Sequence, residues 1–181
     1  KTNHNNFLNL AFNLAKINLG KTKSNPSVGC VVVKNNSVIS SGQTSNNGRP
    51  HAEFNALKNN KNYKNSDLYV TLEPCTHQGV TPPCTDIIKK KGIKRIFFTF
   101  DDLDKRTAKK LKINLSNNKI KIYQKKIKSY SNFYQSYFYN KKSNLPFVDA
   151  KIAVSKDYFT INKKSKWITN SQSRKRAHLI R

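Results

Sequence analysis

Pro74-Cys75-Thr76-His77-Gln78-Gly79-Val80-Thr81-Pro82-Pro83-Cys84, which follows His51-Ala52-Glu53 along the chain, constrains the fold more than any other segment. Its two thiols and the His51 imidazole are ligands that zinc prefers. Three protein ligands with a fourth position open distinguish a catalytic zinc site from a structural one, which usually closes with another Cys or His. The sequence therefore predicts a catalytic zinc centre formed by His51, Cys75 and Cys84.

Glu53 is the predicted catalytic residue of this centre. Zinc lowers the pKa of a bound water to about 7. Attack of that water on a ring carbon that bears an exocyclic amine requires a proton to reach the departing nitrogen, and a carboxylate can move it. His51 and Glu53 are two residues apart and would diverge by about 200° within a helix. We therefore expect a helix to begin at His51, with Glu53 in its first turn.

Three other interpretations of these residues stay open. His77 is a candidate fourth ligand of a structural zinc knuckle. Cys75 and Cys84 could form a disulfide, although the chain has three Cys and no visible secretory signal, a context in which such a pair more often binds metal. Glu53 could be an ordinary exposed acid in the first turn of a helix.

The order His-x-Glu, Pro-Cys and Cys is typical of zinc deaminases. Residues 70–84, with a long inter-cysteine loop, closely resemble the bifunctional riboflavin-biosynthesis family called RibD. Residues 24–33 are similar to the first strand of that family, and residues 145–157 with 166–169 to the opening of its reductase domain. In tRNA adenosine and cytidine-type deaminases, which are the alternative, only two residues separate the cysteines.

The resemblance implies a reaction and a cofactor. The family hydrolyses the 2-amino group of 2,5-diamino-6-(5-phosphoribosylamino)pyrimidin-4(3H)-one, which gives 5-amino-6-(5-phosphoribosylamino)uracil and ammonia. By position, His51, Cys75 and Cys84 would hold one zinc ion, and Glu53 would be the proton shuttle. The complete family protein also reduces the ribose with NADPH, a step for which this chain holds no complete site.

Other site residues are implied by position alone. Asn25 resembles the residue that reads the pyrimidine edge, although a plain turn residue before Pro is the alternative. His77 resembles the loop residue near the ribose-phosphate, although an exposed loop His is equally compatible. Asp102 matches a substrate-binding position. Lys151 and Trp167 match cofactor-binding positions of the reductase half.

The chain departs from the family pattern near the expected phosphate. Val80 stands where a basic residue is common, and Thr44 where a His is common. Asp104 takes the position of an Asn. We expect these changes to leave the zinc chemistry intact and to alter how the ribose-phosphate is held, with Lys105 or Arg106 as a substitute cation.

Hydrophobic periodicity predicts alternating helices and strands. This pattern indicates a three-layer α/β/α cytidine-deaminase-like domain with a mixed sheet of about five strands, over residues 1–143, and an incomplete α/β reductase domain over 144–181. Cys30 is expected in the core. The expected strands are 28–33, 38–40, 68–72, 95–100, 119–123 and 147–154, and the expected helices include 7–17, 106–115 and 171–181.

The aromatic residues of 130–138 recur at helical spacing. We expect them to pack against the sheet or the next domain, and a stacking surface for nucleic acid is the alternative. The sequence contains no Met, and about 35 residues after 144 are too few for a reductase domain. We therefore expect the chain to be a fragment of a longer bifunctional protein, which would be a homo-oligomer when complete.

The formal net charge of +26 would ordinarily suggest nucleic acid or an anionic membrane as a partner. Here Lys is spread along the whole chain, so we interpret the charge as solvated surface and expect a phosphorylated pyrimidine as the partner, without nucleic acid. No apolar run approaches the roughly 20 residues of a membrane span, and no signal peptide is visible. The expected location is the cytoplasm.

Overall fold

The central strand β3 (Asp67–Leu72) is buried at every position, because strands pair with both its edges and helices cover both faces of the sheet. The computed structural model describes residues 3–160, 165 and 167–179. Within them, a five-stranded sheet has the order β2-β1-β3-β4-β5. The other strands are β1 (Gly29–Lys34), β2 (Ser37–Gln43), β4 (Arg95–Phe100) and β5 (Lys121–Gln124).

The sheet is mixed, as the sequence predicted. β1 pairs antiparallel with β2 and β3, whereas β3, β4 and β5 run parallel to one another. The carboxyl ends of β3 and β4 therefore lie at the same edge, which is where ligands bind in many α/β folds. Cys75 follows β3 and Asp102 follows β4, so the topology places both residues at this edge.

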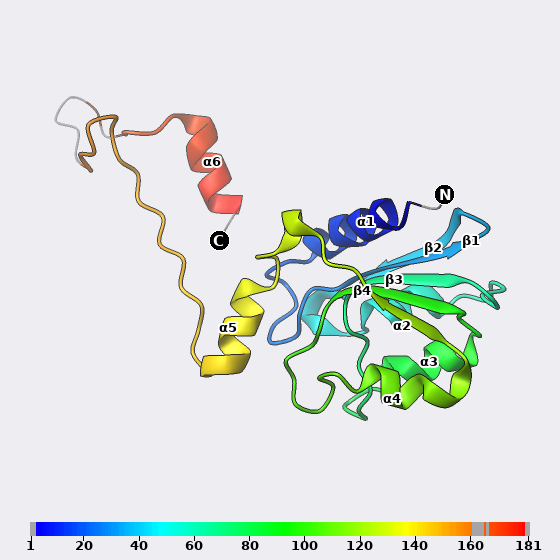
Figure 1. Cartoon of the computed structure of the whole chain (residues 1–181). Coiled ribbons are helices and arrows are strands. Elements are labelled where there is room, and N and C mark those ends of the chain that lie inside the picture. The colour runs from blue at the N-terminus through cyan, green and yellow to red at the C-terminus, as the bar shows by residue number, and fades with distance from the viewer. Residues whose placement is uncertain (1–2, 161–164, 166, 180–181) are drawn as a thin grey trace. The chain divides into compact units, whose positions relative to one another are not determined.

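Helices form a layer on each side of the sheet (Figure 1). The two-residue period of the strands sends Val31, Tyr69 and Phe97 to the face covered by α1 (His4–Ile17). Their neighbours Val32, Val70 and Phe98 face the other side, which holds the larger core. That side is covered by α2 (Ala52–Leu57), α3 (Cys84–Lys90) and α4 (Leu111–Leu115). The predicted three-layer α/β/α architecture is confirmed, and Cys30 is fully buried in it.

Gly42 sets the position of α2, and with it the first part of the zinc motif. A Cβ at Gly42 would lie 2.6 Å from the carbonyl oxygen of Ala52 and from the backbone nitrogen of Ala56. Real side chains never approach a backbone so closely, so only Gly lets β2 and α2 pack at this separation. His51 is the residue that immediately precedes α2.

The predicted helix over 106–115 is wrong in its first half. Only Leu111–Leu115 is α-helical, and Lys109 has a φ of 58°, which interrupts a helix. The buried Glu73 carboxylate accepts hydrogen bonds from the backbone N–H groups of Lys109 and Leu111. A tertiary contact thus replaces the hydrogen bonds that a longer helix would have made.

The aromatic segment packs against the sheet side, as expected. Tyr134 is buried, and its ring meets that of Phe100 edge-on at 5.4 Å. The ring of Tyr130 stacks on that of Phe12 at 3.9 Å. The stretch whose aromatic residues recur at helical spacing forms a short turn, η3 (Lys128–Tyr130), followed by the helix α5 (Gln135–Ser143). Two further short turns are η1 (Asn46–Gly48) and η2 (Ser116–Asn118).

The chain divides into two units, residues 1–145 and 146–181. In the second unit the predicted strand over 147–154 is wrong: this stretch is irregular, and Val148 and Ile152 are 78% and 70% exposed. A strand needs a partner for its backbone groups, and the described part of this unit offers none. Helix α6 (Ser171–Leu179) is present where a helix was expected, with residues 180–181 outside the described part. The reductase assignment of 144–181 stays a prediction.

Among the described residues, no helix combines the length and the apolar character that crossing a bilayer requires.

Candidate zinc centre and substrate pocket

The three predicted zinc ligands converge. Nδ1 of His51 lies 3.7 Å from Sγ of Cys75 and 3.5 Å from Sγ of Cys84. All three ligand atoms lie within 4.8 Å of one another. In a tetrahedral site with typical Zn–S and Zn–N bond lengths, nitrogen and sulfur are about 3.5 Å apart. The spacing of the side chains therefore fits a zinc ion.

The two sulfurs are held where an anionic ligand is favoured. Cys75 lies in the loop after β3, and Cys84 is the first residue of α3. The backbone N–H of Cys84 donates to Sγ of Cys75 at 3.2 Å. Hydrogen bonds with Cys84 and His51 lower the pKa of Cys75 to about 4. A thiolate at this position is the form that binds metal.

Two of the alternative interpretations do not fit the structure. Cys75 and Cys84 are both free thiols, so the disulfide is wrong. His77 is not part of the His51, Cys75 and Cys84 group, and its Nδ1 lies 2.9 Å from the hydroxyl of Thr107 instead. The described residues thus offer three ligands at this centre, which is the pattern of a catalytic site.

Glu53 is buried beside the ligand group and is not the exposed acid of the third alternative. It occupies the first turn of α2, and only 4% of its surface is exposed. Burial, and after it the charge of Cys75, raise the pKa of Glu53 to about 7. A carboxyl group with such a pKa can take up and release a proton near neutrality, which is what a proton shuttle must do.

The predicted substrate residues lie in one pocket with the zinc centre. Asn25, His77 and Asp102 line a cavity of about 170 Å³, together with His51 and Glu53 among others. The amide nitrogen of Asn25 donates to the carbonyl oxygen of Gly48 at 3.0 Å, which fixes the orientation of its side chain. Both Asn25 and His77 are half-buried, so neither is a plain surface residue. Their roles in binding stay predictions.

The pocket is also lined by four residues that the sequence did not single out: Arg49, Glu73, Tyr137 and Lys141. Tyr137 and Lys141 are four residues apart on α5 and share a helix face, a spacing that is visible in the sequence. Their closeness to the zinc motif was not visible, because residues more than fifty positions apart meet only through the fold.

The loop after β4 supplies cationic and acidic groups to the same pocket. Of the two expected substitute cations, Arg106 lines the pocket, whereas Lys105 is exposed and is not among its lining residues. The Arg106 guanidinium donates to both carboxylate oxygens of Asp104, at 2.9 and 2.6 Å. Nζ of Lys141 lies 3.6 Å from Asp104. Val80, by contrast, is 86% exposed.

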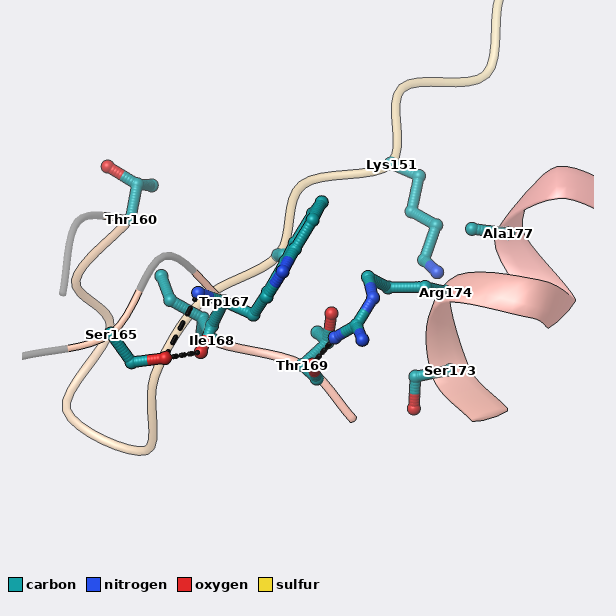
Figure 2. Close-up of a pocket in the computed structure, with 10 residues that line it drawn as sticks. Lys151, Thr160, Ser165, Trp167, Ile168, Thr169, Ser173, Arg174 and Ala177 are labelled. Carbon is teal, nitrogen blue, oxygen red and sulfur yellow. Dashed lines mark hydrogen bonds between the residues drawn. The ribbon is translucent and has the colours of Figure 1, made fainter. Parts of the chain in front are cut away.

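Lys151 and Trp167, the residues matched to the reductase half, line a separate hollow of about 470 Å³ within the second unit (Figure 2). Figure 2 shows Arg174 extending from α6 toward the Trp167 ring, 4.4 Å from its centre. Trp167 is about half exposed and Lys151 is exposed. The structure brings the two residues to one hollow, and their role in binding NADPH stays a prediction.

The geometry agrees with a comparison of the sequence with known families. Residues 1–100 match the model of the cytidine and deoxycytidylate deaminase zinc-binding region. This chain belongs to that zinc-binding deaminase family. The resemblance to RibD is confirmed as well: the chain is 38% identical to the riboflavin biosynthesis protein RibD of Aquifex aeolicus, over 97% of this chain and 51% of that protein.

Solved RibD structures share the fold. The deaminase/reductase of Thermotoga maritima superposes with a TM-score of 0.87 at 32% identity, over 98% of this chain and 52% of that one. RibD of Acinetobacter baumannii (form 1) gives a TM-score of 0.84 at 33% identity, over 96% and 50%. The zinc-binding deaminase thus spans about half the length of the relatives it matches and corresponds to their deaminase half.

Proposed function

We propose that this zinc-binding deaminase hydrolyses the 2-amino group of 2,5-diamino-6-(5-phosphoribosylamino)pyrimidin-4(3H)-one in riboflavin biosynthesis, releasing ammonia and 5-amino-6-(5-phosphoribosylamino)uracil. The observation that carries the proposal is the convergence of His51, Cys75 and Cys84 beside a pocket that is lined by His51, Cys75 and the buried Glu53. Polar and charged side chains, Asn25, His77 and Asp102 among them, line the same pocket. The similarity to RibD over nearly the whole chain supports the same substrate.

In the proposed reaction, His51 and the two thiolates would hold zinc, which would make hydroxide available at neutral pH. The carboxylate of Glu53 would take one proton from the attacking water and pass it to the ring nitrogen. It would then take the second proton from the hydroxyl of the adduct and pass it to the departing amine, so that one water is consumed, the C–N bond breaks and ammonia leaves. Burial of Glu53 keeps bulk water from competing for that proton.

The remaining pocket residues suit the rest of a ribotide. We assign Asn25 to the pyrimidine edge, Asp102 to a ribose hydroxyl, and His77 to the ribose-phosphate. Arg106 and Lys141 line the same wall and carry the positive charge that a phosphate requires. Val80 is apolar and exposed, so it provides no positive charge for the phosphate. Arg106, from the loop after β4, and Lys141, from α5, provide that charge instead.

The complete protein would also reduce the ribose with NADPH, which we propose for the longer RibD-like polypeptide and not for this chain. A homo-oligomer is expected of the same longer protein. The cytoplasm, where a phosphorylated intermediate would be retained, is the proposed location.

Ammonia release by the zinc-loaded chain tests the proposed function. The ribotide and a tRNA anticodon stem-loop would be offered separately, with Glu53→Gln as the matched inactive control. Turnover of the ribotide alone supports the proposal. Turnover of the RNA would favour a tRNA adenosine deaminase, although the eight residues between Cys75 and Cys84 argue against that class. A zinc-loaded chain that deaminates neither compound would contradict the proposal.

A further inference from the structure

Tyr137 reaches the pocket from α5, a helix that lies outside the segment matched by the deaminase family model. Its hydroxyl donates a hydrogen bond to Oδ1 of Asp102 at 2.9 Å. Tyr134 is buried in the core and its hydroxyl donates to the carbonyl oxygen of Ser27, and the rings of Tyr130, Phe133 and Phe138 pack against the same core. Tyr137 therefore differs from Tyr134, because its hydroxyl bonds to a residue that lines the pocket and not to a residue of the core.

The Asp102 carboxylate is held on one oxygen only. Oδ1 accepts from the Tyr137 hydroxyl and from the backbone N–H of Asp104, the latter at 3.0 Å. The backbone N–H of Asp102 itself donates to Glu73 at 3.2 Å. Among the described residues, none donates a hydrogen bond to Oδ2 of Asp102. The side chain is 8% exposed and lines the pocket, so one acceptor atom is left for a ligand.

The donor is itself fixed in place. The Tyr137 ring packs against those of Tyr134 and Phe138, with centroids 6.4 and 5.7 Å away, and Nζ of Lys141 lies 5.6 Å from its centre. Burial, and after it the Asp102 charge, raise the pKa of Tyr137, so its hydroxyl stays protonated and donates. A donor that cannot ionise or rotate away holds the carboxylate in one orientation.

We propose that Tyr137 is a positioning residue that aims Asp102 at a ribose hydroxyl of the substrate and thereby favours a ribotide over the free pyrimidine base. This role rests on the proposed function. The base must lie at the zinc centre for deamination, so the sugar must lie along the wall formed by Asp102, Asp104 and α5. A carboxylate with one free oxygen binds a sugar hydroxyl there, while its other oxygen is occupied by Tyr137 and Asp104.

Tyr137→Phe removes the hydroxyl alone and tests this role in the zinc-loaded chain. We expect the KM for the ribotide to rise about fivefold to tenfold, which corresponds to a loss of about 1 to 1.4 kcal/mol of binding free energy, with kcat nearly unchanged. Turnover of the matching triaminopyrimidinone base, which lacks the sugar, should be unaffected. In an Asp102→Asn background the same substitution should add little, because its effect passes through Asp102.

Tyr134→Phe is the matched control. It removes a buried hydroxyl that bonds to Thr71 and Ser27 in the same segment, so it should lower the melting temperature and leave the KM unchanged. Suppose that wild type deaminates the ribotide. The positioning role is then wrong if Tyr137→Phe leaves the KM for the ribotide unchanged, or if it impairs turnover of the base as much as turnover of the ribotide. In either case the proposed function stands. If wild type releases no ammonia from the ribotide, both fall.

Discussion

Nδ1 of His77 lies 2.9 Å from the hydroxyl of Thr107, and this contact joins the loop between the two cysteines to the loop after β4. Thr107 is fully buried, so its hydroxyl is a fixed partner, whereas His77 is half-buried and lines the pocket. One loop carries zinc ligands and the other carries Asp102. The hydrogen bond therefore couples the position of the expected sugar wall to that of the metal centre.

Thr107→Val tests this coupling, because Val has nearly the same shape and cannot hydrogen-bond. We expect the KM for the ribotide to rise about threefold to tenfold, since the bond is worth about 1 kcal/mol. Zinc content should stay at one ion per chain. Steady-state kinetics with metal analysis checks both. An unchanged KM would mean that the two loops are positioned independently.

Glu53→Gln should separate metal binding from catalysis. The amide keeps the size of the side chain and cannot shuttle a proton, so kcat should fall by a factor of about 10² to 10⁴. Zinc binding should persist, because Glu53 lies outside the ligand group. Metal analysis and ammonia release on the same sample make the measurement. Loss of zinc from this variant would instead make Glu53 a ligand.

Cys84→Ser should remove the zinc, whereas Cys30→Ala should not. Cys84 lies within the ligand group, and Cys30 is a fully buried core residue on β1. The expected result is a metal-free Cys84→Ser chain without deaminase activity. Cys30→Ala should bind one zinc ion and be less stable by about 1 kcal/mol. Equal zinc loss in both variants would point to general unfolding as the cause.

The zinc centre was predictable because the residues of each half of its motif lie close together in the sequence. His51 and Glu53 are two residues apart, and Cys75 and Cys84 flank one short loop, so residue type and spacing alone indicate the chemistry. The strands were predictable for the same reason, since β1, β3 and β4 are apolar runs bounded by turn residues.

The pairing of Tyr137 with Asp102 in the pocket was not predictable in this way. Tyr137 and Asp102 are 35 residues apart, and no residue pattern in either segment indicates that the two side chains meet. The false helix over 106–110 has the same origin, because the carboxylate of Glu73 binds backbone groups that local propensity assigns to a helix. The strand expected over 147–154 failed because strand propensity does not supply the neighbouring strand that pairing requires.

Glu73→Gln should loosen the loop after β4. Its two carboxylate oxygens accept three backbone N–H groups, those of Asp102, Lys109 and Leu111, and an amide offers only one oxygen. Leaving a buried N–H without an acceptor costs about 1 to 3 kcal/mol. We expect urea unfolding to show a loss of this size and the KM for the ribotide to rise. Asp86→Asn, at an exposed acid on α3, is the control and should change neither.

Asp104 should make the stability of the chain depend on acidity. The Arg106 guanidinium, which binds both of its oxygens, holds the pKa of Asp104 well below the ordinary value of about 3.9. The folded state therefore binds the proton less tightly than the unfolded state does. The resulting stability is present above about pH 4 and is lost as the pH falls below it.

Comparison of wild type with Asp104→Asn by urea unfolding measures that contribution. Arg106 is 62% exposed, so solvent screens the pair, and we expect a difference of less than about 1 kcal/mol at pH 7. The difference should begin to shrink below about pH 4 and be smaller at pH 3 than at pH 7, because Asp104 is then increasingly protonated in the unfolded chain. Zinc release at low pH affects both proteins and cancels in the comparison. A difference that stays constant from pH 7 to pH 3 would show that Asp104 stabilises the loop through its shape and backbone contacts, and not through its charge.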